Sequence, residues 1–163
     1  MKKILLLPLL LIMIACNRTE EETVNRCTGT AAPALALGDN RETNILTKDF
    51  WVIEYYIGVR DFETQKANRG KWYKFLKNGT FASGHWGERG CDGTWTIDYS
   101  TQYPLVILDS YDDNEDVAWH IQAVTPDLNE MSLVGGNGYS NYSDMVKAIN
   151  LLTMPTKKQF GDE

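Results

Sequence analysis

The feature that most constrains the fold is a series of short hydrophobic runs, broken by turn residues every eight to twelve positions, from Phe50 to about residue 154. Apolar side chains occupy every second position of the first run: Trp51, Ile53, Tyr55, Ile57 and Val59. This period of two is typical of a half-buried β-strand. No run is long enough for the helical crossover that parallel strands need, so we expect an antiparallel sheet.

Seven further strand-like segments follow: 71–76, 80–86, 93–98, 104–109, 117–124, 131–136 and 145–154. Asn78-Gly79 is a strong hairpin signal, because both residues adopt the positive φ of a tight turn. We interpret the last segment as a strand, with a short helix capped by Ser143 as the alternative. Eight strands in simple succession predict an all-β fold, an up-and-down antiparallel β-barrel without exposed edges. An open β-sandwich is the alternative architecture.

The first sixteen residues predict where the chain is sent. Lys2 and Lys3 precede twelve uncharged residues, a run shorter than the roughly 20 residues of a spanning helix and typical of a signal peptide. The small Ala15 before Cys16 resembles the lipobox of bacterial lipoproteins, although the two preceding residues depart from that motif. The resemblance implies cleavage before Cys16 and lipidation of that residue, which would anchor the chain to a membrane. An ordinary secretory signal is the alternative.

We expect four regions: a signal peptide over 1–15, the lipidated cysteine and a tether over 16–45, the barrel over 46–155, and a tail over 156–163. Arg18, followed by three glutamates, resembles the surface-export signal of lipoproteins in some Gram-negative lineages. A solvated tether explains the same charges. The expected location is the cell envelope, with the lipid on Cys16 in the outer membrane and the surface or periplasmic side left open.

Charge and composition exclude several classes of function. The chain has 16 basic and 22 acidic residues, a net charge of −6, which argues against a nucleic-acid partner. Loss of Lys2 and Lys3 with the signal peptide leaves 14 basic residues against 22 acidic ones, a net charge of −8. Two histidines and three cysteines are too few for most multi-ligand metal sites. No cofactor is predicted.

Four short motifs carry a resemblance to a family. They are Trp51 at the start of the first strand, the F-x-x-x-G-T-F hairpin from Phe75 to Phe81, the G-T-W of Gly93 to Trp95, and the W-x-I of Trp119 to Ile121. Together they resemble the lipocalin-like domains of Gram-negative envelope lipoproteins over about residues 46–154. The glycine usual two residues before the first tryptophan is Asp49 here. The resemblance implies a barrel of the calycin type that binds a ligand in its lumen.

Aromatic side chains are the candidate ligand contacts. Trp51, Tyr55, Trp95 and Trp119 are expected to face inward, where they would line a pocket for a small apolar ligand. The same pattern is expected if these rings only fill the barrel as its core.

Cys27 and Cys91 are candidates for a disulfide bond, because thiols outside the cytoplasm often pair. The bond would tie the tether to the loop before the fourth strand; two free thiols are the alternative. Catalysis by Cys91 is poorly supported, since only His85 lies near it in the sequence.

The acidic run 109–116 is a weak calcium candidate. Asp112, Asn114 and Asp116 have the spacing of the first three ligands in a calcium loop. However, Val117 stands where that loop needs glycine, and Ala123 where it needs glutamate. A solvated hairpin turn is the favoured interpretation.

Two functions therefore remain in view, and no catalytic residue is predicted. The first is a non-enzymatic lipoprotein that binds a small apolar ligand in its barrel. The second is a plugged barrel that presents its acidic loops to a protein or glycan. An outward cluster of Tyr56, Trp72, Trp86, Tyr139 and Tyr142 would indicate the surface, and not the lumen, as the site. A small hydrolase is a remote third, needing His85 or His120 beside a carboxylate.

Overall fold

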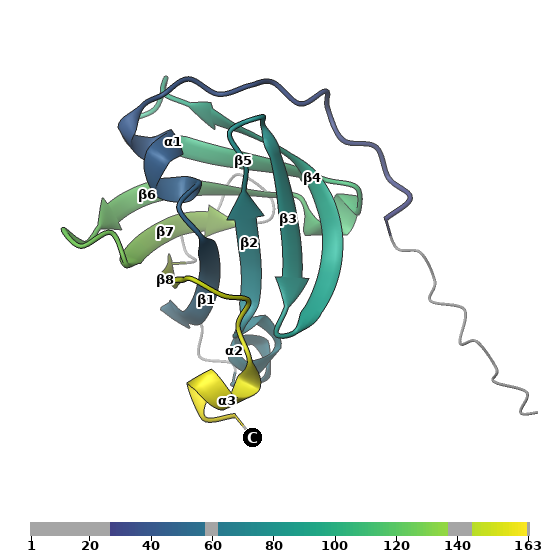
Figure 1. Ribbon diagram of the computed structural model, residues 1–163, viewed down its shortest axis with the longest axis vertical. Helices are drawn as coiled ribbons and strands as arrows, with labels where there is room; N and C mark the ends of the chain where they lie inside the picture. Colours follow the sequence, from purple (N-terminus) through teal and green to yellow (C-terminus); the bar gives the residue numbers. More distant parts are fainter. Residues whose placement is uncertain (1–26, 58–61, 137–144, 163) are drawn as a thin grey trace, which may run out of the picture.

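Eight antiparallel strands close into a barrel in the computed structural model, which describes residues 27–57, 62–136 and 145–162 (Figure 1). The strands are β1 Phe50–Ile57, β2 Lys71–Phe75, β3 Thr80–His85, β4 Glu88–Asp98, β5 Leu105–Ser110, β6 Val117–Val124, β7 Glu130–Gly136 and β8 Met145–Leu151. Each strand pairs with the next, and β8 pairs back with β1. This closure confirms the predicted barrel and the strand assignment of the last segment, and it shows that the open sandwich was wrong.

Short helices accompany the barrel: α1 Arg41–Leu46, α2 Phe62–Asn68, the 3-10 helix η1 Asp113–Glu115, and α3 Lys157–Phe160. None of the helices in the described ranges is long and apolar enough to cross a membrane. The side chain of Asn40 caps α1 by accepting a hydrogen bond from the Thr43 amide. Helix α1 places Ile45 and Leu46 in the core, where the Trp51 indole donates to the Ile45 carbonyl at 3.2 Å.

The core is the filled lumen of the barrel. Every strand contributes inward side chains to a single buried cluster, and aromatic rings dominate it. Its aromatic members are Trp51, Tyr73, Phe75, Phe81, Trp95 and Trp119. The rings of Phe75 and Trp95 pack at a centroid distance of 4.9 Å. A barrel of eight strands is just wide enough for side chains to fill it, and these rings do so.

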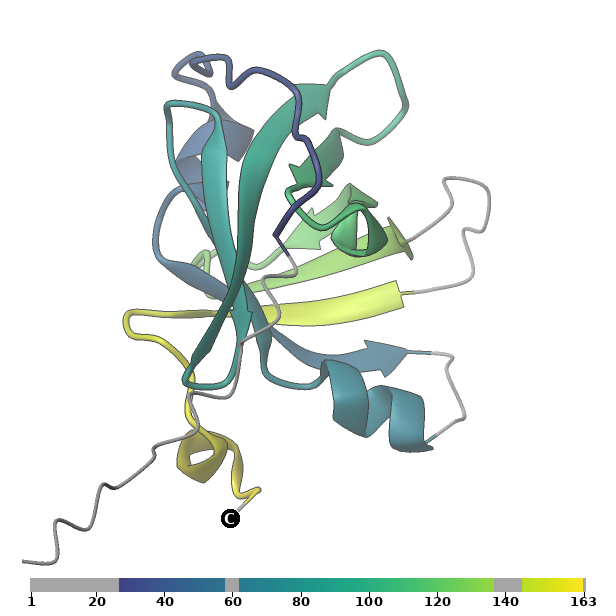
Figure 2. The same cartoon turned by 90° about the vertical axis from the view of Figure 1, so that its right-hand side faces the viewer.

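The chain before α1 lies along the outside of the barrel (Figure 2). Backbone hydrogen bonds join Gly29 to Tyr111 at 2.7 Å and Leu37 to Lys77 at 2.9 Å. Cys27 and Cys91 form a disulfide bond, which confirms the predicted pair. Cys91 lies within β4, however, and not in a loop before it. Of the predicted tether, residues 27–40 are therefore a strap fixed on the barrel wall, and residues 41–45 belong to α1.

The β2–β3 hairpin forms where Asn78-Gly79 predicted it. Gly79 has a φ of 85°, and a Cβ atom there would come within 2.1 Å of the Leu35 carbonyl oxygen. Glycine is therefore needed at this turn for its backbone conformation and for the close approach of the strap.

Candidate functional site

The lumen has almost no free space. A cavity of about 20 Å³ remains at its centre, lined by Trp51, Trp119 and other core side chains, which is room for about one water molecule. Trp51, Trp95 and Trp119 are exposed by only 2%, 1% and 5%. These three candidates do point inward, as predicted, and they act as core packing.

Tyr55 does not point inward, contrary to the prediction. The pairing of β1 with β8 shifts between Ile53 and Tyr55, so one extra residue reverses the alternation of side chains along β1. Tyr55 is consequently 44% exposed on the outer wall. Val59, the last residue of the predicted inward series, lies outside the described residues.

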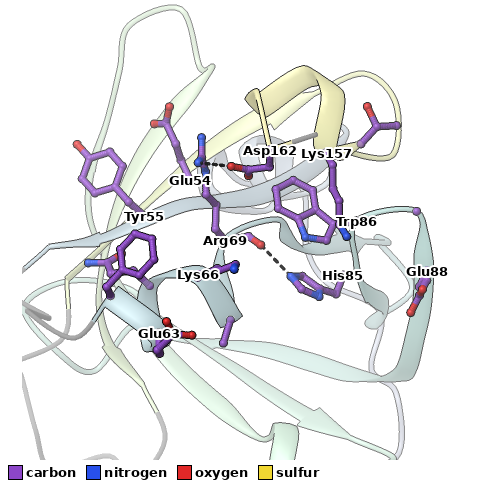
Figure 3. A pocket seen from close by; sticks show the side chains of 15 residues that line it. Glu54, Tyr55, Glu63, Lys66, Arg69, His85, Trp86, Glu88, Lys157 and Asp162 are labelled. Carbon is purple, nitrogen blue, oxygen red and sulfur yellow. Dashed lines mark hydrogen bonds and ion pairs between the residues drawn. The ribbon is translucent and has the colours of Figure 1, made fainter.

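An open groove of about 1180 Å³ lies on the outside of the barrel, between the end of β1, α2, the β3–β4 turn and the segment of α3 (Figure 3). Its aromatic side chains are Tyr55, Phe62 and Trp86. Phe62, the first residue of α2, is 72% exposed. We call this site the outer groove.

Trp86 forms one wall of the outer groove and is held from three sides. A Cβ atom on Gly70 would meet the Trp86 ring at 2.4 Å, so the indole lies flat against bare backbone. The ring meets Phe160 edge-on at a centroid distance of 5.3 Å and lies 5.5 Å from His85. The carbonyl of Trp86 accepts a hydrogen bond from the Trp72 indole at 2.8 Å. This wall is rigid.

Arg69 fastens the C-terminal segment to the end of α2. Its guanidinium forms an ion pair with Asp162 at 2.8 Å, donates to the Phe160 carbonyl at 3.0 Å, and lies 5.5 Å from the Phe160 ring centroid. The Arg69 carbonyl faces Nε2 of His85 at 2.8 Å. One residue thus connects α2, α3 and the β3–β4 turn into a single site.

Charges in the outer groove nearly balance. Three cationic side chains line it, those of Lys66, Arg69 and Lys157, against four carboxylates, those of Glu54, Glu63, Glu88 and Asp162. At its edge Lys147 pairs with Glu54 at 2.9 Å and with Glu130 at 3.1 Å. Hydrogen bonds to Glu54 and Glu130 raise the pKa of Lys147 above its usual value.

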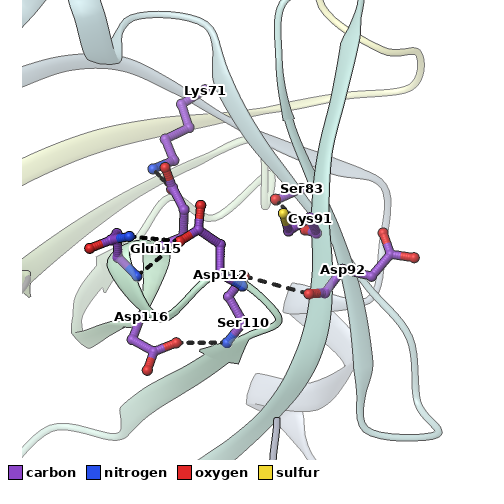
Figure 4. A network of polar contacts seen from close by, with 9 residues as sticks. Lys71, Ser83, Cys91, Asp92, Ser110, Asp112, Glu115 and Asp116 are labelled. Atoms are coloured by element: carbon purple, nitrogen blue, oxygen red, sulfur yellow. Dashed lines mark hydrogen bonds and ion pairs between the residues drawn. The ribbon is translucent and has the colours of Figure 1, made fainter. Parts of the chain in front are cut away.

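A separate polar network lies around η1 (Figure 4). Lys71 of β2 forms an ion pair with Glu115 of η1, and Ser83 donates to the Cys91 carbonyl at 2.6 Å. Burial, with a contribution from the Glu115 carboxylate, raises the pKa of Tyr73 beneath this network.

Two of the calcium candidates, Asp112 and Asp116, accept hydrogen bonds from nearby backbone amides. Asp112 caps η1 through the Asn114 amide at 3.1 Å, and Asp116 accepts from the Ser110 amide at 2.7 Å. Within the described ranges, no group of three or more His, Cys, Asp or Glu side chains is placed to hold a metal ion. The histidines contact backbone carbonyls, His85 that of Arg69 and His120 that of Tyr103.

The outward aromatic cluster can be examined only in part. The side chain of Tyr56 and all of Tyr139 and Tyr142 lie outside the described part of the chain. Trp72 faces outward but is 2% exposed, and its ring meets Phe50 at 5.3 Å. Trp86 is partly buried beside it. These two tryptophans support the outer wall and do not form an exposed patch of their own.

Most residues of the outer groove carry no signal in the sequence, including Phe62, Lys66, Arg69 and Asp162. One signal pointed to part of it: Thr156 and Gln159 form the capping box of α3, a spacing that can be read from sequence. The groove joins segments distant in the chain, so no local pattern indicates it.

A comparison with solved structures gives a neighbour of similar fold. No family model and no curated protein matches this chain. A crystal structure of a DUF4847 family protein from Bacteroides vulgatus, at 1.00 Å resolution, is similar with 14% identity and a TM-score of 0.45, covering 69% of this chain and 99% of that one. A likeness at this level carries no argument about what the protein does.

Proposed function

We propose that this protein is a non-enzymatic binding module, anchored to the outer membrane through a lipid on Cys16, whose partner binds in the outer groove and not in the lumen. One observation carries the choice of site: the groove offers about 1180 Å³ and the lumen about 20 Å³. Sites for small molecules usually occupy roughly 300–1,000 Å³. The surface-binding alternative is therefore favoured over an apolar ligand inside the barrel.

The anchor part of the proposal rests on the sequence. The signal peptide and the lipobox-like Ala15-Cys16 support lipidation, and the mature net charge of −8 supports attachment by lipid and not by the acidic domain itself. Binding to an envelope partner would then take place close to the membrane.

Amide hydrogen exchange tests the binding site. The full chain, expressed with its own N-terminus and purified in detergent, is compared with and without a solubilised envelope extract. We expect added protection in α2 (62–68) and in the β3–β4 turn (85–88). The Phe62→Ala variant should lose this protection.

A panel of apolar small molecules supplies the opposing outcome. Native mass spectrometry and tryptophan fluorescence should show no bound mass and no quenching. A bound apolar molecule that protects β2 and β6, whose rings line the lumen, would show that the binding site is the barrel interior and not the outer groove.

A further inference from the structure

We propose that the outer groove binds a neutral oligosaccharide chain; this inference rests on the proposed function, because it names the ligand of the same site. Sugar rings combine a face of C–H groups with a rim of hydroxyls. Their recognition requires exposed aromatic faces next to many hydrogen-bonding groups, and the outer groove offers both.

The aromatic faces come from Phe62 and Tyr55, which are 72% and 44% exposed and belong to different elements, α2 and β1. Aromatic rings attract the weakly positive C–H groups of a ligand through their electron-rich faces. Trp86 adds a third ring, fixed against Gly70 and Phe160. The three rings therefore come from three different elements that line one groove.

The polar groups suit hydroxyls better than a charged ligand. Three cations and four carboxylates line the groove, and Arg69 with Asp162 already forms an ion pair at 2.8 Å. A polyanion would meet the carboxylates of this groove on a chain of net charge −6, and repulsion would oppose its binding. A neutral polyol can donate to Glu88 and accept from Lys66 and Lys157 without a net charge penalty.

A peptide is the less suitable occupant. An extended peptide usually adds to a free sheet edge, and the described strands close into a barrel in which each has two neighbours. A helical peptide needs a continuous apolar groove, whereas three cations and four carboxylates line this groove along with its aromatic rings.

The test measures binding of neutral hexasaccharides. Isothermal titration calorimetry of the full chain, in a detergent without a sugar headgroup, uses maltohexaose, cellohexaose, mannohexaose and N-acetylchitohexaose at up to about 10 mM. At least one should bind, and Phe62→Ala and Tyr55→Ala should each weaken that sugar by about tenfold. Tyr103→Ala is the matched control, because Tyr103 is 41% exposed and does not line the groove. This variant should bind the sugar with the affinity of the wild type.

Three outcomes would overturn the ligand class. None of the four sugars binds; a sugar binds equally well to the Phe62→Ala variant; or neutral fifteen-residue peptides bind and protect α2 while the sugars do not. In the first and third cases, protection of α2 by the envelope extract would leave the proposed function standing and remove only the sugar. If the envelope extract also failed to protect α2, both the sugar ligand and the proposed function would be overturned.

Discussion

Trp86 adopts a φ of 51°, in the left-handed region that bulky residues avoid. It begins the two-residue turn between β3 and β4, where asparagine or glycine is the common choice. Contacts with Gly70, Phe160 and the Trp72 indole hold it there. Strained residues of this kind often mark functional sites, and Trp86 lines the outer groove.

The substitution Gly70→Ala should destabilise the fold by about 2 kcal/mol or more. Gly70 has a φ of 82°, and the added Cβ would meet the Trp86 ring at 2.4 Å. Urea unfolding measures the loss. Gly38→Ala is the control, since a Cβ there meets nothing within 4 Å; equal effects of the two substitutions would contradict this account.

Asp127 should contribute stability that depends on pH. Hydrogen bonds from the Thr125 side chain and the Asn129 amide lower the pKa of Asp127 below its usual 3.8. A lowered pKa in the folded state gives stability that is present above pH 3.8 and lost as pH falls through the folded value. Asp127→Asn should therefore have a lower urea midpoint than wild type at pH 7 and the same midpoint near pH 2. Glu88→Gln controls for the loss of one charge.

Among the elements, the strap over residues 27–40 shows most clearly what the sequence leaves out. Its residues are small and lack a period, so they carry no strand or helix signal. Its contacts depend on the finished barrel. They include backbone hydrogen bonds, one disulfide bond, a hydrogen bond from the Ala32 amide to the Asp109 carboxylate at 3.0 Å and an ion pair of Asp39 with Lys77 at 3.2 Å. The strands were predictable, because their period of two follows from burial of one face.

Removing the disulfide with Cys27→Ser and Cys91→Ser together should cost about 4 kcal/mol, the chain-entropy value for a loop of 64 positions. Unfolding in urea, with and without reductant, measures the difference. Reductant should lower the stability of the wild type and leave that of the double variant unchanged. A double variant as stable as the oxidised wild type would show that the disulfide bond contributes nothing to stability.

At the scale of the whole molecule, the barrel was predicted correctly, whereas the outer groove was not predicted. Closure follows from eight alternating segments in succession. The reversal of Tyr55 depends on a single bulge in the β1–β8 ladder, for which the sequence has no local signal. The outer groove joins β1, α2, the β3–β4 turn and α3, so it exists only once these elements pack together.

Lipidation is tested on the whole chain. Cys16→Ser should move the protein from the membrane fraction to the soluble fraction and remove the acyl mass from the N-terminal peptide, because the lipid is the proposed anchor. Cell fractionation and intact-mass spectrometry measure this. The Cys27→Ser and Cys91→Ser double variant is the matched control and should stay at the membrane. Retention of Cys16→Ser at the membrane would point to a different anchor.

The disulfide at Cys27 also limits the distance between the barrel and the membrane. With Cys16 lipidated as proposed, eleven residue steps separate the bilayer from the point fixed on β4, a span of at most about 40 Å. If the chain were first held at α1, 25 steps would allow about 90 Å. The volume that the barrel can explore scales with the cube of the tether length. The shorter tether therefore gives the barrel an effective concentration, for a membrane-bound partner, about tenfold higher than the longer one would.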